Sequence, residues 1–262
     1  MSAVRDVPYR GGGFALRQRR GLPIVAFLLL IATWEMASLA GLLPALFVPA
    51  PHAVARAFYK LLISGKLVEH VAASLGRIVL GWILGTTAGL ALGFAMGVFS
   101  VARALGMALT AALFPVPKIA LLPLFILWFG IGEPSKIATI AFGVFFPTVV
   151  STYAAVDHVP RNLIAMAQSF GVPARDIVRK VIVPGALPGV LAGFRISSSI
   201  ALILVVAAEM IGAQVGIGAF VLTAGNLMQT DQLIAGVLVL SLLGLAASSS
   251  ISALERRLLR WR

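Results

Sequence analysis

The chain contains no cysteine and only three histidines, His52, His70 and His158, among its 262 residues. Disulfides, thiolate metal ligands and cysteine nucleophiles are therefore excluded, and the histidines are too scattered to suggest a metal site. The hydrolase and metalloprotease motifs GxSxG and HExxH are also missing. No catalytic constellation emerges, so we expect neither an enzyme nor a metal centre.

Charged residues are scarce: they make up 11% of the chain, whereas apolar residues make up 60%. Soluble domains have about 25% charged and about 45–50% apolar residues. So few charges cannot cover a body of this size in water, and the mean hydropathy of +1.02 points the same way. The composition predicts an integral membrane protein whose surface lies largely in lipid.

Six apolar runs are long enough to cross a bilayer, which needs about 18 residues or more. They cover residues 23–40, 78–99, 104–129, 137–155, 187–211 and 233–251. We treat the first run as a helix and not a signal peptide, because Glu35 interrupts it and no clear cleavage site follows. The predicted fold class is an all-α polytopic membrane protein. Its six-span domain covers 23–254, between basic tails at 1–22 and 255–262.

Acidic residues are few: nine Asp and Glu against 21 Lys and Arg give a net charge of +12. Six spans place both termini on one side of the membrane. That side carries 14 of the basic residues and the opposite side carries four. The positive-inside rule therefore predicts cytoplasmic termini, and the excess charge is explained by topology without nucleic acid.

The second predicted span has a glycine at every fourth position. These residues are Gly81, Gly85, Gly89, Gly93 and Gly97. One side of this helix has no side chains to hold a neighbour away, and small residues are typical of helix contacts in lipid. The stripe predicts close helix packing, either within the chain or at a subunit contact.

The third predicted span contains Pro115, Pro117 and Pro123. Each proline removes a backbone donor and clashes with the preceding turn, so we expect this helix to be kinked or broken. Broken helices persist in membranes only where the freed backbone groups face protein or a wet cavity. The segment is thus either a pathway element or a packed kink.

The loop at 156–186 has the pattern of two short helices. Pro160 stands at the start of the first, and Gly171 follows it where a left-handed cap is expected. Pro173 opens the second, which spans 174–183 with apolar residues at helical spacing and is expected to stop at Pro184. We predict a helix-turn-helix that packs either on the membrane interface or in a groove of a soluble partner.

The same loop resembles the EAA loop of the membrane subunits of bacterial ABC importers. Ala165-Met166-Ala167 precedes Gly171 by the family spacing, and Val181-x-Val183-Pro184 follows. The family pattern is Glu-Ala-Ala, Gly, then Ile-x-Leu-Pro, so the usual glutamate is replaced by Ala165. Other segments resemble the aliphatic sulfonate, taurine and nitrate branch of these permeases: 48–51, 62–65, 70–77, 121–124, 128–133, 184–188, 193–195 and 207–210.

The resemblance implies a permease subunit in the bacterial cytoplasmic (inner) membrane that moves a small anionic solute. An aliphatic sulfonate or taurine is favoured, with nitrate, bicarbonate or a pyrimidine precursor as alternatives. It implies a second copy of the chain, two ATP-binding subunits on the cytoplasmic side and an extracytoplasmic solute-binding protein. The chain lacks the GxxxxGK[ST] phosphate loop, so ATP and magnesium are expected in the partner and no cofactor in this chain.

Under this reading the helix-turn-helix forms the coupling helices that contact the ATPase. The residues expected at that contact are Ala165, Met166, Ala167, Gln168, Ser169, Phe170, Gly171, Val172, Pro173, Arg175 and Ile177. ATP-driven closure of the ATPases would then move the two loops together and switch the pathway between its inward- and outward-facing states.

Ionisable residues inside spans are costly, which makes them candidates for the solute pathway. Lys118, Arg195 and Glu209 are such residues, and Arg195 or Lys118 could offset the charge of an anionic solute. The structural alternative for each is snorkelling or a hydrogen bond between helices. An ion-coupled secondary transporter is the competing class, but it usually has an internal repeat, and the two halves show no convincing one.

Overall fold

The computed structural model describes residues 21–259, and this part of the chain is helical with no strand. Predictions for most of the N-terminal tail, and for the last three residues of the C-terminal one, lie outside the described residues. The chain divides into two units, residues 1–56 and residues 57–262.

The first unit contains α1 (Leu22–Leu39) and the first turns of α2 (Pro51–Ile63). Helix α1 carries Glu35, the acid that interrupts the first apolar run. Its carboxylate accepts a hydrogen bond from the backbone N–H of His52 (3.3 Å) and lies 2.6 Å from His52 Nδ1. Glu35 therefore accepts a backbone hydrogen bond at the start of α2, where a negative charge also complements the helix dipole.

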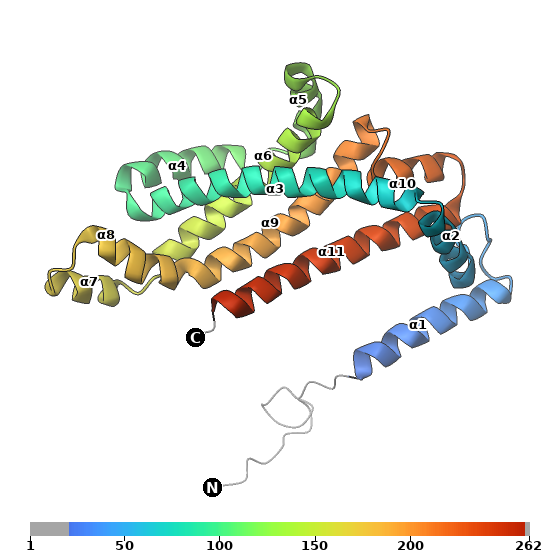
Figure 1. Cartoon of the computed structure of the whole chain (residues 1–262), viewed down its shortest axis with the longest axis horizontal. Helices are drawn as coiled ribbons and strands as arrows, with labels where there is room; N and C mark the ends of the chain where they lie inside the picture. Colours follow the sequence, from blue (N-terminus) through green and yellow to red (C-terminus); the bar gives the residue numbers. More distant parts are fainter. Residues whose placement is uncertain (1–20, 260–262) are drawn as a thin grey trace, which may run out of the picture. The chain divides into compact units, whose positions relative to one another are not determined.

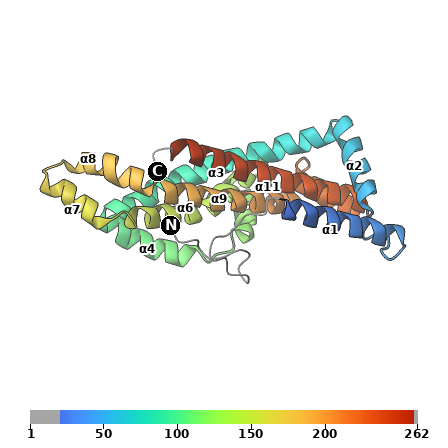
Figure 2. The same cartoon turned by 90° about the horizontal axis from the view of Figure 1, so that it is seen from below.

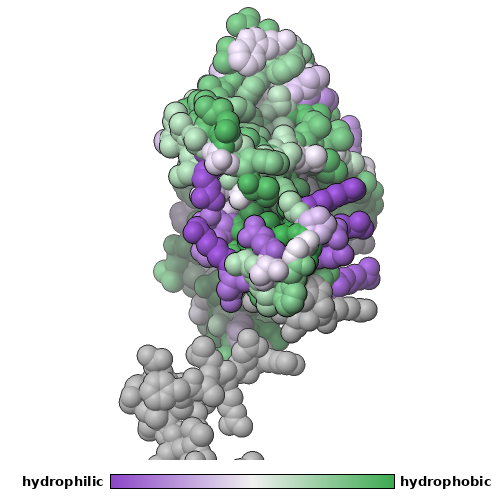
Figure 3. All heavy atoms as spheres, turned by 90° about the vertical axis from the view of Figure 1, so that its left-hand side faces the viewer, coloured by the Kyte–Doolittle hydropathy of each residue, from purple (hydrophilic) through white to green (hydrophobic). Residues whose placement is uncertain are grey.

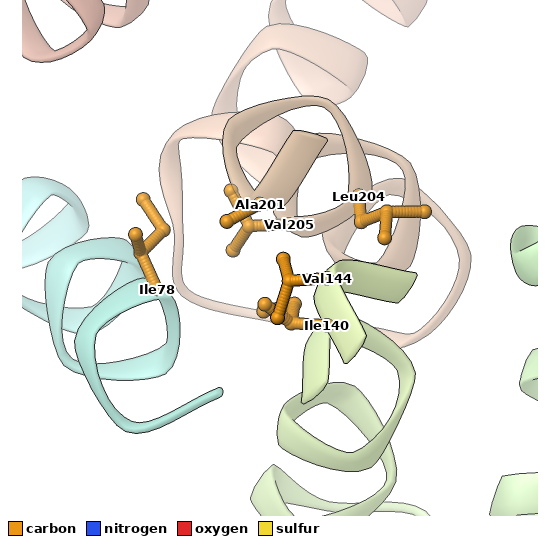
Figure 4. Packing of buried hydrophobic residues seen from close by; sticks show 6 residues of the cluster. All are labelled: Ile78, Ile140, Val144, Ala201, Leu204 and Val205. Atoms are coloured by element: carbon orange, nitrogen blue, oxygen red, sulfur yellow. The ribbon is translucent and has the colours of Figure 1, made fainter. Parts of the chain in front are cut away.

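The second unit is built on four long helices that run side by side (Figures 1 and 2). They are α3 (Lys66–Val98), α6 (Glu133–Asp157), α9 (Val183–Gly212) and α11 (Thr230–Leu258). Helix α6 contacts α3 and α9, and α9 contacts α11. The core where α3, α6 and α9 meet (Figure 4) consists of Ile78, Ile140, Val144, Ala201, Leu204 and Val205.

The glycine stripe of α3 lies against α6 of the same chain. A β-carbon at Gly93 would stand 2.6 Å from the carbonyl oxygen of Val149, and one at Gly81 would stand 2.7 Å from Ile140. The other members, Gly85, Gly89 and Gly97, face α6 in the same way. The stripe thus allows close backbone approach within one subunit.

This packing predicts that Gly93→Ala lowers stability, because its β-carbon would meet backbone oxygen that cannot move away cheaply. Overpacking of this kind costs about 1–3 kcal/mol. Gly76→Ala is the matched control: it lies in the same helix with nothing within 4 Å of the new atom. Thermal unfolding of the purified protein in detergent should show a lower Tm for Gly93→Ala only; equal Tm values would contradict the packing argument.

The third predicted span is broken, as expected. Helix α4 (Ser100–Leu113) and the pair formed by the 3-10 turn η2 (Lys118–Leu121) and α5 (Leu122–Phe129) meet at an angle of 87°. Pro115 and Pro117 lie in the break, while Pro123 stands in the first turn of α5, where its missing N–H costs nothing. As a result α5 stands out from the bundle (Figure 1).

Helices cover all six predicted spans, but several boundaries differ. Helix α3 begins twelve residues earlier than expected, and α6 begins at Glu133, so that Lys136 is a buried helical residue and not part of a loop. Helix α11 continues past 254 to Leu258. Helix α10 (Ile217–Asn226) was not predicted, because ten residues are too short for a span.

The predicted end of the second loop helix at Pro184 is wrong. Helix α8 (Ala174–Ile177) passes through a π-helical turn, η3 (Val178–Ile182), directly into α9. Pro184 lies in the first turn of α9. A wider π turn accommodates a proline ring that would clash with a regular preceding turn, so one helical segment runs from Ala174 to Gly212.

Within the described residues, five helical segments are long and apolar enough to cross a membrane. The number becomes six if the bent pair of α4 and α5 is one span.

Candidate functional site

The predicted helix-turn-helix is present at one end of the second unit (Figure 1). Helix α7 (Arg161–Ser169) ends two residues before Gly171, which has the left-handed φ of +68°. The N–H of Gly171 donates to the carbonyl of Gln168 (2.9 Å), and the N–H of Val172 donates to that of Ala167 (3.1 Å). This pair of bonds is a Schellman cap, which turns the chain sharply into α8.

The turn exposes apolar side chains. Phe170 is 79% exposed, and Leu163 and Met166 are exposed beside it on α7. Seen end-on, this face shows hydrophilic side chains around an apolar patch (Figure 3). A large aromatic side chain in solvent among basic residues is a typical protein contact surface.

The other predicted contact residues divide by exposure. Those with exposed side chains or surfaces are Ala165, Met166, Gln168, Ser169, Phe170, Gly171, Pro173 and Arg175. Ala167 and Val172 are half-buried. Ile177 is buried, so it supports the loop from inside and does not reach its surface.

A small core fixes this loop to the long helices. Val156, Val159 and Ala186 are buried there, and Ile164 of α7 and Ile182 of η3 pack against them. Helix α8 is also continuous with α9, so the exposed turn is joined to a long helix without an intervening loop.

A buried polar network lies at the opposite end of α6. Arg77 of α3 is its centre: Nη1 donates to Glu209 of α9 (2.6 Å) and to the carbonyl of Val215 (2.7 Å). Nε and Nη2 each donate to a carboxylate oxygen of Glu133 at 2.6 Å. Three long helices are thus joined by one guanidinium group.

The Glu209 side chain has no exposed surface, and both of its carboxylate oxygens accept hydrogen bonds. Ser74 Oγ donates to it at 2.7 and 2.9 Å, and the N–H of Gly218 donates at 2.8 Å. Ser74 Oγ in turn accepts from the N–H of Ile217 (2.8 Å). Glu209 therefore anchors the start of α10, the short helix that the sequence did not predict.

The three predicted pathway residues are not brought together. Lys118 Nζ donates to the carbonyls of Leu113 (3.0 Å) and Val116 (2.8 Å), and to that of Phe114 between them. It therefore replaces the backbone donors that the break at α4 removes. Arg195 of α9 pairs with Glu255 of α11 at 2.7 Å. The helix-to-helix alternative thus describes the contacts of Arg195 and Glu209.

Sequence reasoning missed Ser74, Arg77, Glu133 and Lys136 as members of one site. Arg77 gave a usable signal, since an arginine inside an apolar segment needs a partner. Its partners are 56 and 132 residues away in the chain, and only the folded packing pairs them. Each partner does lie in a segment that carries the family resemblance.

The long apolar helices describe a multi-pass membrane protein, with an exposed apolar turn at one end of its long helices. The family model described as "Binding-protein-dependent transport system inner membrane component" matches residues 78–260. The chain belongs to this family and is the permease of an ABC importer.

Several relatives support the assignment. The chain is 36% identical to a Bacillus subtilis protein assigned as an aliphatic sulfonates transport permease, over 89% of this chain and 84% of that one. It is 35% identical to the taurine transport system permease of Escherichia coli, over 92% and 89%. It is 34% identical to the riboflavin transport system permease of Chloroflexus aurantiacus, over 92% and 90%.

A solved structure with the same fold is an inward-facing MetNI methionine ABC transporter, with a TM-score of 0.60 and 21% identity, covering 76% of this chain and 97% of that one. The chain is thus a multi-pass inner-membrane transport component, not an enzyme. It works with an ATPase subunit, which uses the ATP, and with a binding protein.

Proposed function

We propose that two copies of this chain form the pathway of an ATP-driven importer for a small anionic solute, with an aliphatic sulfonate or taurine favoured. Both termini and the α7–α8 turn then face the cytoplasm, where two ATPase subunits hold ATP and magnesium. An extracytoplasmic binding protein delivers the solute at the opposite end. Nitrate, bicarbonate or a pyrimidine precursor are the alternative solutes.

The observation that carries the coupling role is the exposed turn around Phe170 at the head of a continuous helix. Exposed apolar surface of this kind needs a partner groove, and Phe170 is 79% exposed. The helix from Ala174 to Gly212 passes any displacement of the turn to the level of Glu209 without an intervening loop. ATP-driven movement of the ATPase would therefore tilt α9 and reshape the pathway.

The solute class rests on a different observation, the names of the relatives. Sulfonate and taurine permeases are 35–36% identical to this chain over most of its length. The second copy is supported by the exposed apolar side chains of α5, which stands out from the bundle: Leu127, Trp128 and Phe129 are all more than half exposed. These side chains need lipid or a second copy around them.

The test is uptake by the complete system. The chain, its ATPase and its binding protein, produced in a bacterium that lacks sulfonate uptake, should restore growth on taurine or ethanesulfonate as the sole sulfur source. An ATPase variant that cannot hydrolyse ATP should abolish this growth. Uptake that persists without ATP hydrolysis and follows an ion gradient would instead support a secondary transporter, and uptake of a different solute only would overturn the sulfonate assignment.

A further inference from the structure

Two buried cations face one exposed carboxylate at the first turn of α6. The Arg77 guanidinium donates a hydrogen bond of 2.6 Å to each carboxylate oxygen of Glu133. Lys136 Nζ lies 3.7 Å from Glu133 Oε1. We call this pair of cations, Arg77 and Lys136, the cradle. The cradle is contributed by α3 and α6, and its anion is supplied by the chain itself.

The two sides of this contact differ sharply in burial. The side chains of Arg77 and Lys136 are 5% and 6% exposed, whereas that of Glu133 is 56% exposed. Within residues 21–259, the Glu133 carboxylate has no polar partner other than the cradle. The cations are therefore fixed, while the carboxylate can leave into solvent by rotation of its own side chain.

Lys136 is poorly satisfied without an anion. Its nearest hydrogen-bond acceptor in the described residues is the carbonyl of Gly132, at 3.1 Å. A buried ammonium has three donors to satisfy. Arg77, in contrast, keeps two partners without Glu133, because its Nη1 donates to Glu209 and to the carbonyl of Val215. Its Nε and Nη2 donors therefore stay in place when the Glu133 side chain rotates away.

The net charge of the buried cluster determines which kind of ion the cradle can bind. With Glu133 in place, two cations balance Glu133 and Glu209. With Glu133 swung out, Arg77 and Lys136 against Glu209 leave one net positive charge in a buried position. A monoanion restores neutrality, whereas a neutral molecule or a dianion does not.

We propose that the cradle is a binding site for the anionic group of the solute, which exchanges there with the Glu133 carboxylate. The inference rests on the proposed transport of an anion and deepens it. A sulfonate presents two coplanar oxygens to the guanidinium edge as a carboxylate does. Lys136 also lines a tight crevice, with no room for a water molecule, beside Ile126 of α5 and Ala208 of α9.

The test measures binding of radiolabelled ethanesulfonate to the permease–ATPase complex in lipid nanodiscs, without binding protein. If Glu133 fills the cradle more than nine-tenths of the time, Glu133→Ala should tighten binding at least about tenfold, because the internal competitor is gone. Lys136→Met in the Glu133→Ala background should reverse this gain. Dimethyl sulfone, a neutral probe of similar shape, should bind no better to the variant.

Glu69→Ala is the matched control. It removes an exposed acid from α3 that has no side-chain hydrogen bond or ion pair in the described structure, so a gain there would indicate a general charge effect. Glu133→Gln provides a second variant that retains hydrogen-bonding groups, and its gain should be smaller. Folding of each variant is checked by its Tm.

A folded Glu133→Ala complex that binds ethanesulfonate no tighter than the wild type would overturn the inference and show a purely structural ion pair. Failure of the solute proposal is seen separately, in the growth test with the wild-type system. A system that imports the sulfonate but shows no gain in Glu133→Ala would refute the cradle alone.

Discussion

Replacement of Phe170 by aspartate should separate the permease from its ATPase and abolish uptake. Phe170 is the most exposed large hydrophobic side chain of the α7–α8 turn, at 79%. A buried aromatic anchor at a protein interface is worth about 2–4 kcal/mol, which corresponds to a loss of affinity of about 30-fold or more. A charge placed in the groove adds a desolvation cost on top of the lost contact.

The effect should fall on association and leave the permease folded, since Phe170 lies in solvent and supports no core. Asn162→Asp is the matched control, because it adds the same charge to an exposed position of α7 while keeping its side-chain shape. Copurification of the ATPase with each variant, together with the Tm of the permease alone, gives the two measurements. A Phe170→Asp permease that still retains its ATPase and its uptake would refute the coupling role of this turn.

Loss of the Glu209 carboxylate should be the most damaging single change to stability. Glu209→Ala removes the buried carboxylate that pairs with the Arg77 guanidinium, and it leaves the Ser74 hydroxyl proton and the N–H of Gly218 without their acceptor. Breaking a buried ion pair from one side costs about 3–5 kcal/mol, a large part of the 5–15 kcal/mol that typically holds a protein folded. We expect little folded protein and a strongly reduced Tm in detergent.

Two comparisons separate this effect from a general loss of charge. Asp176→Ala removes an acid from the exposed pair with Lys180, and exposed pairs contribute only about 0–1 kcal/mol. The double replacement Arg77→Met with Glu209→Leu should recover part of the stability, because no buried charge remains unpaired. If Glu209→Ala unfolds at the same temperature as Asp176→Ala, the network is not a major support of the fold.

The two sites lie at opposite ends of α6, since the α7–α8 loop follows its last turn and Glu133 begins its first. A helix of this length places them about 36 Å apart. Helix α9 packs against α6; it begins where the α7–α8 loop ends, and it carries Glu209 near its other end. The proposed ATPase contact and the proposed anion site are thus joined by two packed helices, which would give coupling between them a physical basis.

The sequence determined the features that depend on local chemistry. Apolar runs predicted helices in all six regions, because a bilayer accepts only long stretches of satisfied backbone. The prolines at 115 and 117 predicted the broken span, and Gly171 predicted the left-handed cap of α7. Each of these follows from a residue and its immediate neighbours, so no knowledge of packing was needed.

Only the tertiary structure decided what depends on distant partners. Pro184 predicts a helix end by itself, yet the preceding π turn and the packing of Ala186 against Val156 carry the helix through it. Lys136 is an ordinary loop lysine in the sequence but a buried cation in the fold. The network of Arg77, Glu133 and Glu209 joins segments up to 132 residues apart, because a buried charge selects its partner by proximity in space, which residue order does not encode.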